Sequence, residues 1–199
     1  MNIMFFDVQT IGFPDMKSDY NQNKVYTQLD KFHSARMIKI SWLVSDQKGN
    51  KLLAKDFIIK PDNFEITNSD IHGITMEKAT NLGKPISEVA SQLEEDTKNI
   101  NLLVAHNFKF HFNILCSELY RYEYYKMIDT LQKMKSICTA EQTKELLKMP
   151  LKSTYYIEKY KMPKLEELYK HCFKEKMLKS KDSKEIVNSL SKIFFYLVK

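Results

Sequence analysis

A chain of 199 residues is long enough for one well-packed domain and short for two, so we predict a single domain over residues 1–199. Apolar residues make up 43% and charged residues 28% of the sequence, as in soluble globular proteins, and no long apolar run suggests a membrane span. The three cysteines lack metal-binding or disulfide spacing, and the N-terminus lacks the basic region of a secretory signal. These features predict an intracellular, cytoplasmic protein without membrane attachment.

The net charge of +6 at pH 7 makes nucleic acid a natural partner. Almost all the cations are lysines, and Arg36 and Arg121 are the only arginines. A sequence rich in lysine, asparagine and isoleucine carries this charge whether or not it binds a polyanion. Charge alone therefore does not decide between a nucleic-acid-binding protein and a merely lysine-rich one.

Residues 1–8 predict a buried strand, because the apolar run IMFF leads directly into Asp7. Gly12 and Pro14 then mark a turn. A carboxylate at the end of a buried strand is held rigidly, which is a common arrangement at functional sites. Asp7 is therefore the first candidate site residue.

The rest of the chain predicts strands that alternate with helices. Residues 15–35 are polar and predict a long surface loop, and residues 37–60 predict a β-hairpin that ends at Pro61. Further strands are expected at 102–105 and 136–138, and helices after Pro85, after Asn107, over 141–147, after Pro163 and over 186–197. This order predicts an α/β fold with a mixed sheet flanked by helices.

Five segments resemble motifs of the DnaQ-like (DEDDh) 3′–5′ exonuclease superfamily, whose fold is similar to ribonuclease H. They are FFDVQTIGFP at 5–14, MIKISWLVSDQKGNKL at 37–52, IHGIT at 71–75, LLVAHNFKFHFNIL at 102–115 and KMPKLEELYKHCF at 161–173. Because the segments span nearly the whole chain, the resemblance implies a ribonuclease H-like mixed sheet in a single domain. The long segment after the first motif is most similar to forms found in phages and large DNA viruses.

The resemblance also implies a set of catalytic positions. In this superfamily four carboxylates hold two divalent ions that stabilise the attacking and leaving oxygens of a phosphodiester, and a histidine takes the proton from the attacking water. The first carboxylate is kept as Asp7, the second position holds Gln9 and the third holds His111. The last motif aligns with Ser180 at the histidine and Glu185 at the final acid.

These substitutions predict a catalytically degenerate member of the superfamily. Adjacent divalent ions repel one another, so a site with about half of the anionic charge should hold them poorly. Loss of the general base alone would lower the rate roughly 10²–10⁴-fold. No cofactor is firmly expected, and magnesium or manganese is expected only if the chain is active.

Each candidate also has a structural interpretation. Asp7 is a weak metal-ligand candidate or a polar strand end, and Gln9 is a nucleotide contact or a buried amide. His111 could ligate zinc or manganese, or it could be a hydrogen-bonded residue on a helix face. Glu185 is a weak metal-ligand candidate, but the spacing from Asp182 is that of a helix N-terminal capping box.

Two groups of residues are candidates for nucleic-acid binding. The resemblance places Thr10 and Phe13 beside a terminal nucleotide, although Phe13 could simply pack in the core, and it assigns His106 and Asn107 to the HN pair, which we interpret as bracing the strand end. The second group has aromatic rings interleaved with cations, an arrangement that can stack bases and contact phosphates or form an ordinary packing loop. Its members are Tyr155, Tyr156, Lys159 and Tyr160.

The leading hypothesis is an inactive exonuclease-fold module that binds single-stranded DNA or RNA, or docks a protein of a replication or repair assembly. The first alternative is an active metal-dependent 3′–5′ exonuclease with an altered metal site. The second is a module that only binds other proteins, through the former active-site cleft or residues 15–35.

Overall fold

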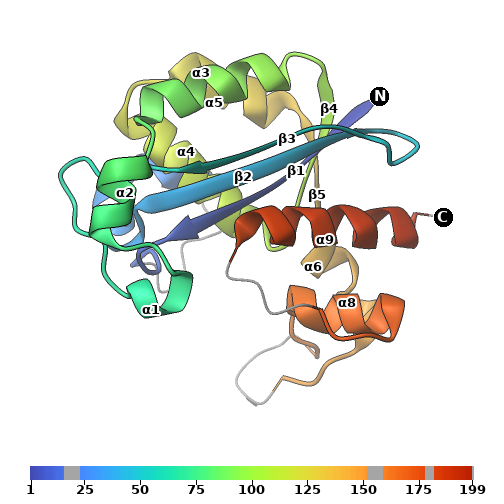
Figure 1. The fold of residues 1–199 in the computed structure, drawn as a ribbon. Helices are drawn as coiled ribbons and strands as arrows, with labels where there is room; N and C mark the ends of the chain where they lie inside the picture. The colour runs from blue at the N-terminus through green and yellow to red at the C-terminus, as the bar shows by residue number, and fades with distance from the viewer. Residues whose placement is uncertain (16–22, 152–158, 178–181, 199) are drawn as a thin grey trace.

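The computed structural model describes residues 1–15, 23–151, 159–177 and 182–198. Its centre is a five-stranded sheet in the order β3-β2-β1-β4-β5, in which β1–β2 and β2–β3 are antiparallel, and β1–β4 and β4–β5 are parallel (Figure 1). The strands are β1 (Asn2–Thr10), β2 (Met37–Asp46), β3 (Lys51–Ile58), β4 (Ile100–Ala105) and β5 (Lys135–Cys138). The predicted mixed sheet, its N-terminal strand and its hairpin are thus confirmed.

Helices flank this sheet (Figure 1). They are α1 (Ser69–His72), α2 (Met76–Leu82), α3 (Ile86–Thr97), α4 (Phe108–Arg121), α5 (Tyr125–Lys133), α6 (Thr139–Gln142), α7 (Lys144–Leu147), α8 (Leu165–Phe173) and α9 (Ser183–Leu197). The predicted helices after Pro85, Asn107 and Pro163 and at the end of the chain are confirmed, while α1, α2 and α5 were not predicted. None of the helices among the described residues is long and apolar enough to cross a membrane.

Alternation along β1 determines which side chains face which layer. Met4, Phe6 and Val8 belong to the main core, which β1 and β2 share with α3, α4 and α5. Ile3 and Phe5 point to the opposite face, where α9 covers them. Asp7 and Gln9 continue this second row, so the sequence period itself directs them toward the α9 face at the end of β1.

The prediction of a long polar surface loop over residues 15–35 is wrong for the part that the structure describes. Residues 23–35 contain two short 3-10 helices, η2 (Val25–Thr27) and η3 (Leu29–Ala35). Their apolar side chains Val25, Tyr26 and Phe32 are buried in the main core against α4 and the sheet. A few apolar residues spaced among polar ones anchor this segment, and the overall polarity concealed them.

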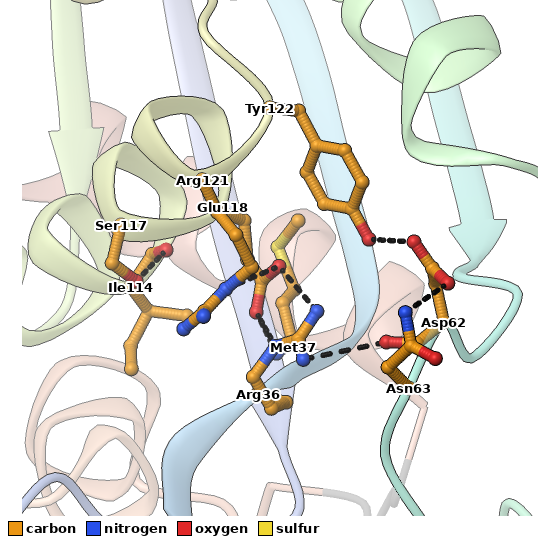
Figure 2. Close-up of polar contacts among 9 residues, drawn as sticks. All are labelled: Arg36, Met37, Asp62, Asn63, Ile114, Ser117, Glu118, Arg121 and Tyr122. Carbon is orange, nitrogen blue, oxygen red and sulfur yellow. Dashed lines mark hydrogen bonds and ion pairs between the residues drawn. The ribbon is translucent and has the colours of Figure 1, made fainter. Parts of the chain in front are cut away.

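A buried ion pair joins the start of β2 to α4 (Figure 2). The Nε and Nη2 atoms of Arg36 donate to the two carboxylate oxygens of Glu118, at 2.7 and 3.2 Å, and the backbone N–H of Met37 donates to the same carboxylate at 3.1 Å. Tyr122, one turn further along α4, donates its hydroxyl to Asp62. This hydrogen-bonded cluster fixes α4 relative to the sheet, and α4 carries His111.

Candidate functional site

Asp7 lies near the end of β1 and is almost completely buried. Its Oδ1 atom is 3.5 Å from Nε2 of His111, and its Oδ2 atom has no hydrogen-bond partner among the described residues. Burial raises the pKa of Asp7 to about 8, although the positive charge of Lys39 partly opposes this effect. The carboxyl group is therefore mostly protonated and neutral at pH 7.

His111 is held beside Asp7 because β1 extends past the end of β4. The pairing of β1 with β4 ends at Phe5, and the backbone N–H of Val8 donates instead to Nδ1 of His111 at 3.1 Å. A ring nitrogen that accepts a hydrogen bond carries no proton, so the neutral imidazole has its proton on Nε2, the atom that faces Asp7. Burial, assisted by nearby His106, lowers the pKa of His111 to about 4.

His106 and Asn107 end β4 and begin α4. The Nε2–H of His106 donates to the carbonyl of Pro163 at 2.8 Å, and its Nδ1 accepts from the hydroxyl of Thr139 at 2.9 Å. Asn107 adopts a left-handed conformation, with φ of 66°, at the N-cap of α4. Both ring nitrogens of His106 are thus used to hold the segments before α6 and α8 against the end of β4.

A cleft of about 290 Å³ opens at this end of the sheet. Asp7, His106 and His111 form one part of its lining, while Lys164 and Ile186 contribute from the start of α8 and from α9. The structure therefore brings Asp7 and His111 together in a cavity that is also lined by apolar residues, by Lys164 and by a second carboxylate, Glu166. Gln9 follows on the same strand face, directly opposite Lys39 of β2.

The predicted last acid, Glu185, is exposed on α9, and it is the next residue, Ile186, that lines the cleft. Asp182 is the N-cap of α9 and accepts a hydrogen bond from the backbone N–H of Lys184 at 3.1 Å, which confirms that the helix begins with a capping residue. Ser180, the position aligned with the catalytic histidine, lies outside the described residues. The sequence alignment placed Glu185 one residue away from the helix position that faces Asp7.

The residues at this cleft do not fit the pair of divalent ions that the sequence resemblance implies. Gln9 has no charge, His111 presents an N–H group rather than a lone pair toward Asp7, and Asp7 and Glu166 are the carboxyl groups that line the cleft among the described residues. Ile186 offers no ligand atom. Among the described residues, no group of three histidine, cysteine, aspartate or glutamate side chains is arranged to hold a metal ion.

The turn after β1 presents an aromatic ring to solvent. Phe13 is 80% exposed, so the interpretation that it packs in the core is wrong, and its ring centroid lies 6.0 Å from that of Phe110. Thr10 donates its hydroxyl to the carbonyl of Gly12, and Ser34 donates to the carbonyl of Phe13. These bonds hold the turn, and Phe110 in turn packs edge-on against His111.

The predicted aromatic and lysine-rich segment is only partly described, since Tyr155 and Tyr156 lie outside the described residues. Tyr160 pairs with Pro150 in a short antiparallel bridge, and the ammonium of Lys159 lies 5.4 Å from the Tyr160 ring centroid. The nearby Lys161 is engaged by Glu167, at 2.8 Å. Neither Lys159 nor Tyr160 is among the residues that line the cleft beside Asp7.

Sequence reasoning missed Lys39, which lies beside the site on β2 and is buried. Its ammonium contacts the carboxylates of Asp56 and Asp182. The signal was available in part, because Lys39 lies within the strand that the sequence predicts at 37–44, but its place opposite Gln9 depends on the register of the two strands. Ile186 could not be found in this way, because its placement depends on how α9 packs.

No protein-family model matches the sequence, and no curated protein matches it. Solved structures do match. An exonuclease I structure superposes with a TM-score of 0.72 over 98% of this chain and 40% of its own, at 14% identity. The zinc-bound complex of E. coli exonuclease I with single-stranded DNA gives 0.67, at 14% identity over 99% of this chain and 42% of its own. The enzyme from Methylocaldum szegediense gives 0.65, at 14% identity, with 98% of this chain and 40% of that chain covered.

This chain has the fold of exonuclease I. The predicted ribonuclease H-like class is therefore confirmed, and the chain spans about two fifths of the length of the matched exonuclease chains. At 14% identity the match shows the fold alone, so any activity has to be argued from the residues of the site.

Proposed function

We propose that this chain is a catalytically degenerate exonuclease-fold domain that binds single-stranded nucleic acid without cleaving it. The observation that carries the proposal is the set of residues that line the cleft with Asp7, where the neutral imidazole of His111 and the side chain of Ile186 stand beside one further carboxylate, Glu166. Phosphodiester cleavage by this fold requires several anionic oxygen ligands that gather divalent ions. Among the described residues the cleft offers two carboxyl groups, fewer than a pair of ions needs.

Three observations support nucleic acid as the ligand. The chain carries a net charge of +6, and Lys164 places one of these charges at the cleft. Phe13 offers an exposed ring for base stacking, and this ring contacts Phe110, which in turn packs against His111. The matched exonuclease I structures include complexes with single-stranded DNA and with a dT13 oligonucleotide.

Binding is tested by fluorescence anisotropy with a labelled oligo-dT strand at low salt and in EDTA. The wild-type chain should bind, and its affinity should fall with added salt as phosphate contacts are screened. Phe13→Ala should weaken binding about 5- to 150-fold, the value of one lost stacking contact of about 1–3 kcal/mol. Leu52→Ala, which removes another exposed apolar side chain from β3, is the matched control and should bind as the wild type does.

Cleavage is tested separately, with the same strand and with RNA in the presence of magnesium or manganese. The wild type should give no more product than Asp7→Ala. Degradation that Asp7→Ala abolishes would establish the active-exonuclease alternative instead. Absence of binding even at low salt would favour a module that only binds proteins.

A further inference from the structure

The charged cluster of Lys39, Asp56 and Asp182 lies on the α9 face of the sheet and takes no part in the function proposed above. The ammonium nitrogen of Lys39 is 2.7 Å from Oδ1 of Asp182 and 3.1 Å from Oδ2 of Asp56. Lys39 comes from β2, Asp56 from β3 and Asp182 from the N-cap of α9. One buried cation thus joins carboxylates from two elements that are far apart in the sequence.

Neighbouring hydroxyl groups complete this cluster. Ser41 lies opposite Asp56 in the strand pair and donates its hydroxyl to that carboxylate, and it also shares a hydrogen bond with Ser183, the first residue of α9. Both serines are completely buried. The N-terminus of α9 is therefore fixed to the sheet by an ion pair and a hydroxyl bridge, directly beside the strand position of Asp7, which pairs with Ser41.

The groups around the Lys39 ammonium are arranged as they would be around a bound cation. Two carboxylates from different elements converge on it, and its charge lowers the energy of ionised groups nearby, as its effect on Asp7 indicates. Burial alone would lower the pKa of Lys39, but its hydrogen bonds with Asp182 and Asp56 outweigh that cost and raise the pKa above its ordinary value. Lys39 is therefore a charged ammonium at neutral pH.

We propose that Lys39 is a built-in counter-ion that takes the structural place of a divalent cation, so that α9 closes the cleft without any metal. The inference rests on the metal-free part of the proposed function and is independent of nucleic-acid binding. It also explains why the cleft keeps its form although its residues do not fit a pair of ions. Without the ammonium, Asp56 and Asp182 would converge on an empty position that suits a hard cation with oxygen ligands.

The test is thermal unfolding of the wild type and of Lys39→Ala, each in EDTA and in millimolar manganese chloride. The wild-type Tm should be the same in both solutions. Lys39→Ala should unfold roughly 2–8 °C lower in EDTA, because Asp56 and Asp182, whose side chains are 31% and 47% exposed, lose the ammonium between them. Manganese should then raise the Tm of Lys39→Ala by at least about 3 °C, since it binds the folded form in place of the ammonium.

Two further variants make the result specific. Lys84→Ala removes the lysine of an exposed ion pair with Glu88 and should show no response to manganese. Adding Asp182→Asn to Lys39→Ala should abolish the manganese response, because one of the two ligands is lost. A manganese-induced rise in the wild-type Tm, or no manganese response in Lys39→Ala, would overturn the proposal, and the wild-type measurement holds even if Lys39→Ala fails to fold.

Nuclease and oligonucleotide-binding assays on the same wild-type protein separate the two proposals. A wild type that is insensitive to manganese and binds no nucleic acid leaves the role of Lys39 intact and removes the proposed function. A wild type that binds nucleic acid and gains stability from manganese removes the role of Lys39, and the cleavage assay then decides whether the proposed function stands.

Discussion

Glu118 on α4 and Asp7 on β1 are both buried carboxyl groups, yet their surroundings differ in almost every respect. Glu118 accepts two hydrogen bonds from Arg36 and one from the backbone of Met37 (Figure 2). Asp7 has a neutral imidazole 3.5 Å from one oxygen and no hydrogen-bond partner among the described residues for the other. The first group is satisfied by the fold, whereas the second is buried with fewer polar contacts.

This difference distinguishes Glu118, which stabilises the fold, from Asp7, which belongs to the candidate site. A carboxylate that has a bidentate arginine and a backbone donor is stable as a charge and costs the protein nothing further. A carboxyl group that is buried with an unpartnered oxygen destabilises the folded state, and such groups concentrate where a protein binds ligands. The contrast predicts opposite effects of removing the charge at each position.

The largest effect is expected for Glu118→Gln. The substitution keeps the shape but leaves the buried guanidinium of Arg36 without its counter-charge, which should lower the free energy of unfolding by about 3–5 kcal/mol. Urea denaturation measures this loss. The matched control is Glu88→Gln, whose exposed pair with Lys84 should contribute less than about 1 kcal/mol. Equal effects of the two substitutions would contradict the structural role of the Arg36–Glu118 pair.

Asp7→Asn should have the opposite effect on the free energy of unfolding. Because the folded-state pKa of Asp7 is raised to about 8, the wild type loses stability as pH rises from its unfolded value of 3.8 toward 8, by about 1.4 kcal/mol per pH unit. Asparagine does not titrate. The stability of Asp7→Asn relative to the wild type should therefore increase by about 2 kcal/mol between pH 6.5 and pH 8. A constant difference across this range would show that Asp7 is ionised in the folded protein.

The titration of His111 should determine how the free energy of unfolding changes with pH below pH 6.5. Its folded pKa of about 4 lies below the ordinary value of 6.5, so its contribution to stability is present above pH 6.5 and is lost as pH falls toward 4. In the wild type the opposite slope of Asp7 masks this loss. Denaturation of Asp7→Asn between pH 6.5 and pH 5 should reveal it, as a fall of about 2 kcal/mol that His111→Asn in the same background removes.

The smallest effect is expected for Tyr122→Phe, at the rim of the Glu118 cluster. The hydroxyl of Tyr122 donates to Asp62 at 2.9 Å in an exposed position, so its loss should cost about 0.5–1 kcal/mol in urea denaturation. A loss as large as that of Glu118→Gln would mean that the cluster depends on its rim and not on its buried ion pair.

Much of the fold could be predicted because local patterns determine it. The apolar run before Asp7, the alternation over 37–60 and the apolar stripe of α9 each correspond to a real element. The short 3-10 helices near Phe32 were missed because a polar segment can be anchored by a few buried side chains. Helix α5 was missed because its three buried residues lie among exposed polar ones without a capping residue at its start.

The site could be predicted only as far as the sequence segments that carry it. Asp7 and His111 lie close together because β1 extends beyond the end of its pairing with β4, so that the N–H of Val8 can donate to the imidazole. In the sequence, only the resemblance to the two motifs implied that these residues are neighbours. The part played by Lys39 depends on strand register and on the packing of α9, which bring residues 39 and 182 together. Contacts over so many residues have no local signature, and the same holds for Ile186.

The packing of α9 has a consequence for how the chain reaches this structure. Ile3 and Phe5 of β1 and Leu43 of β2 share one apolar cluster with Val187, Leu190 and Phe194 of α9. This face of the sheet therefore stays exposed in a folding intermediate in which α9 has not yet packed. Contacts of such long range slow folding, so such intermediates should be the species most prone to aggregate.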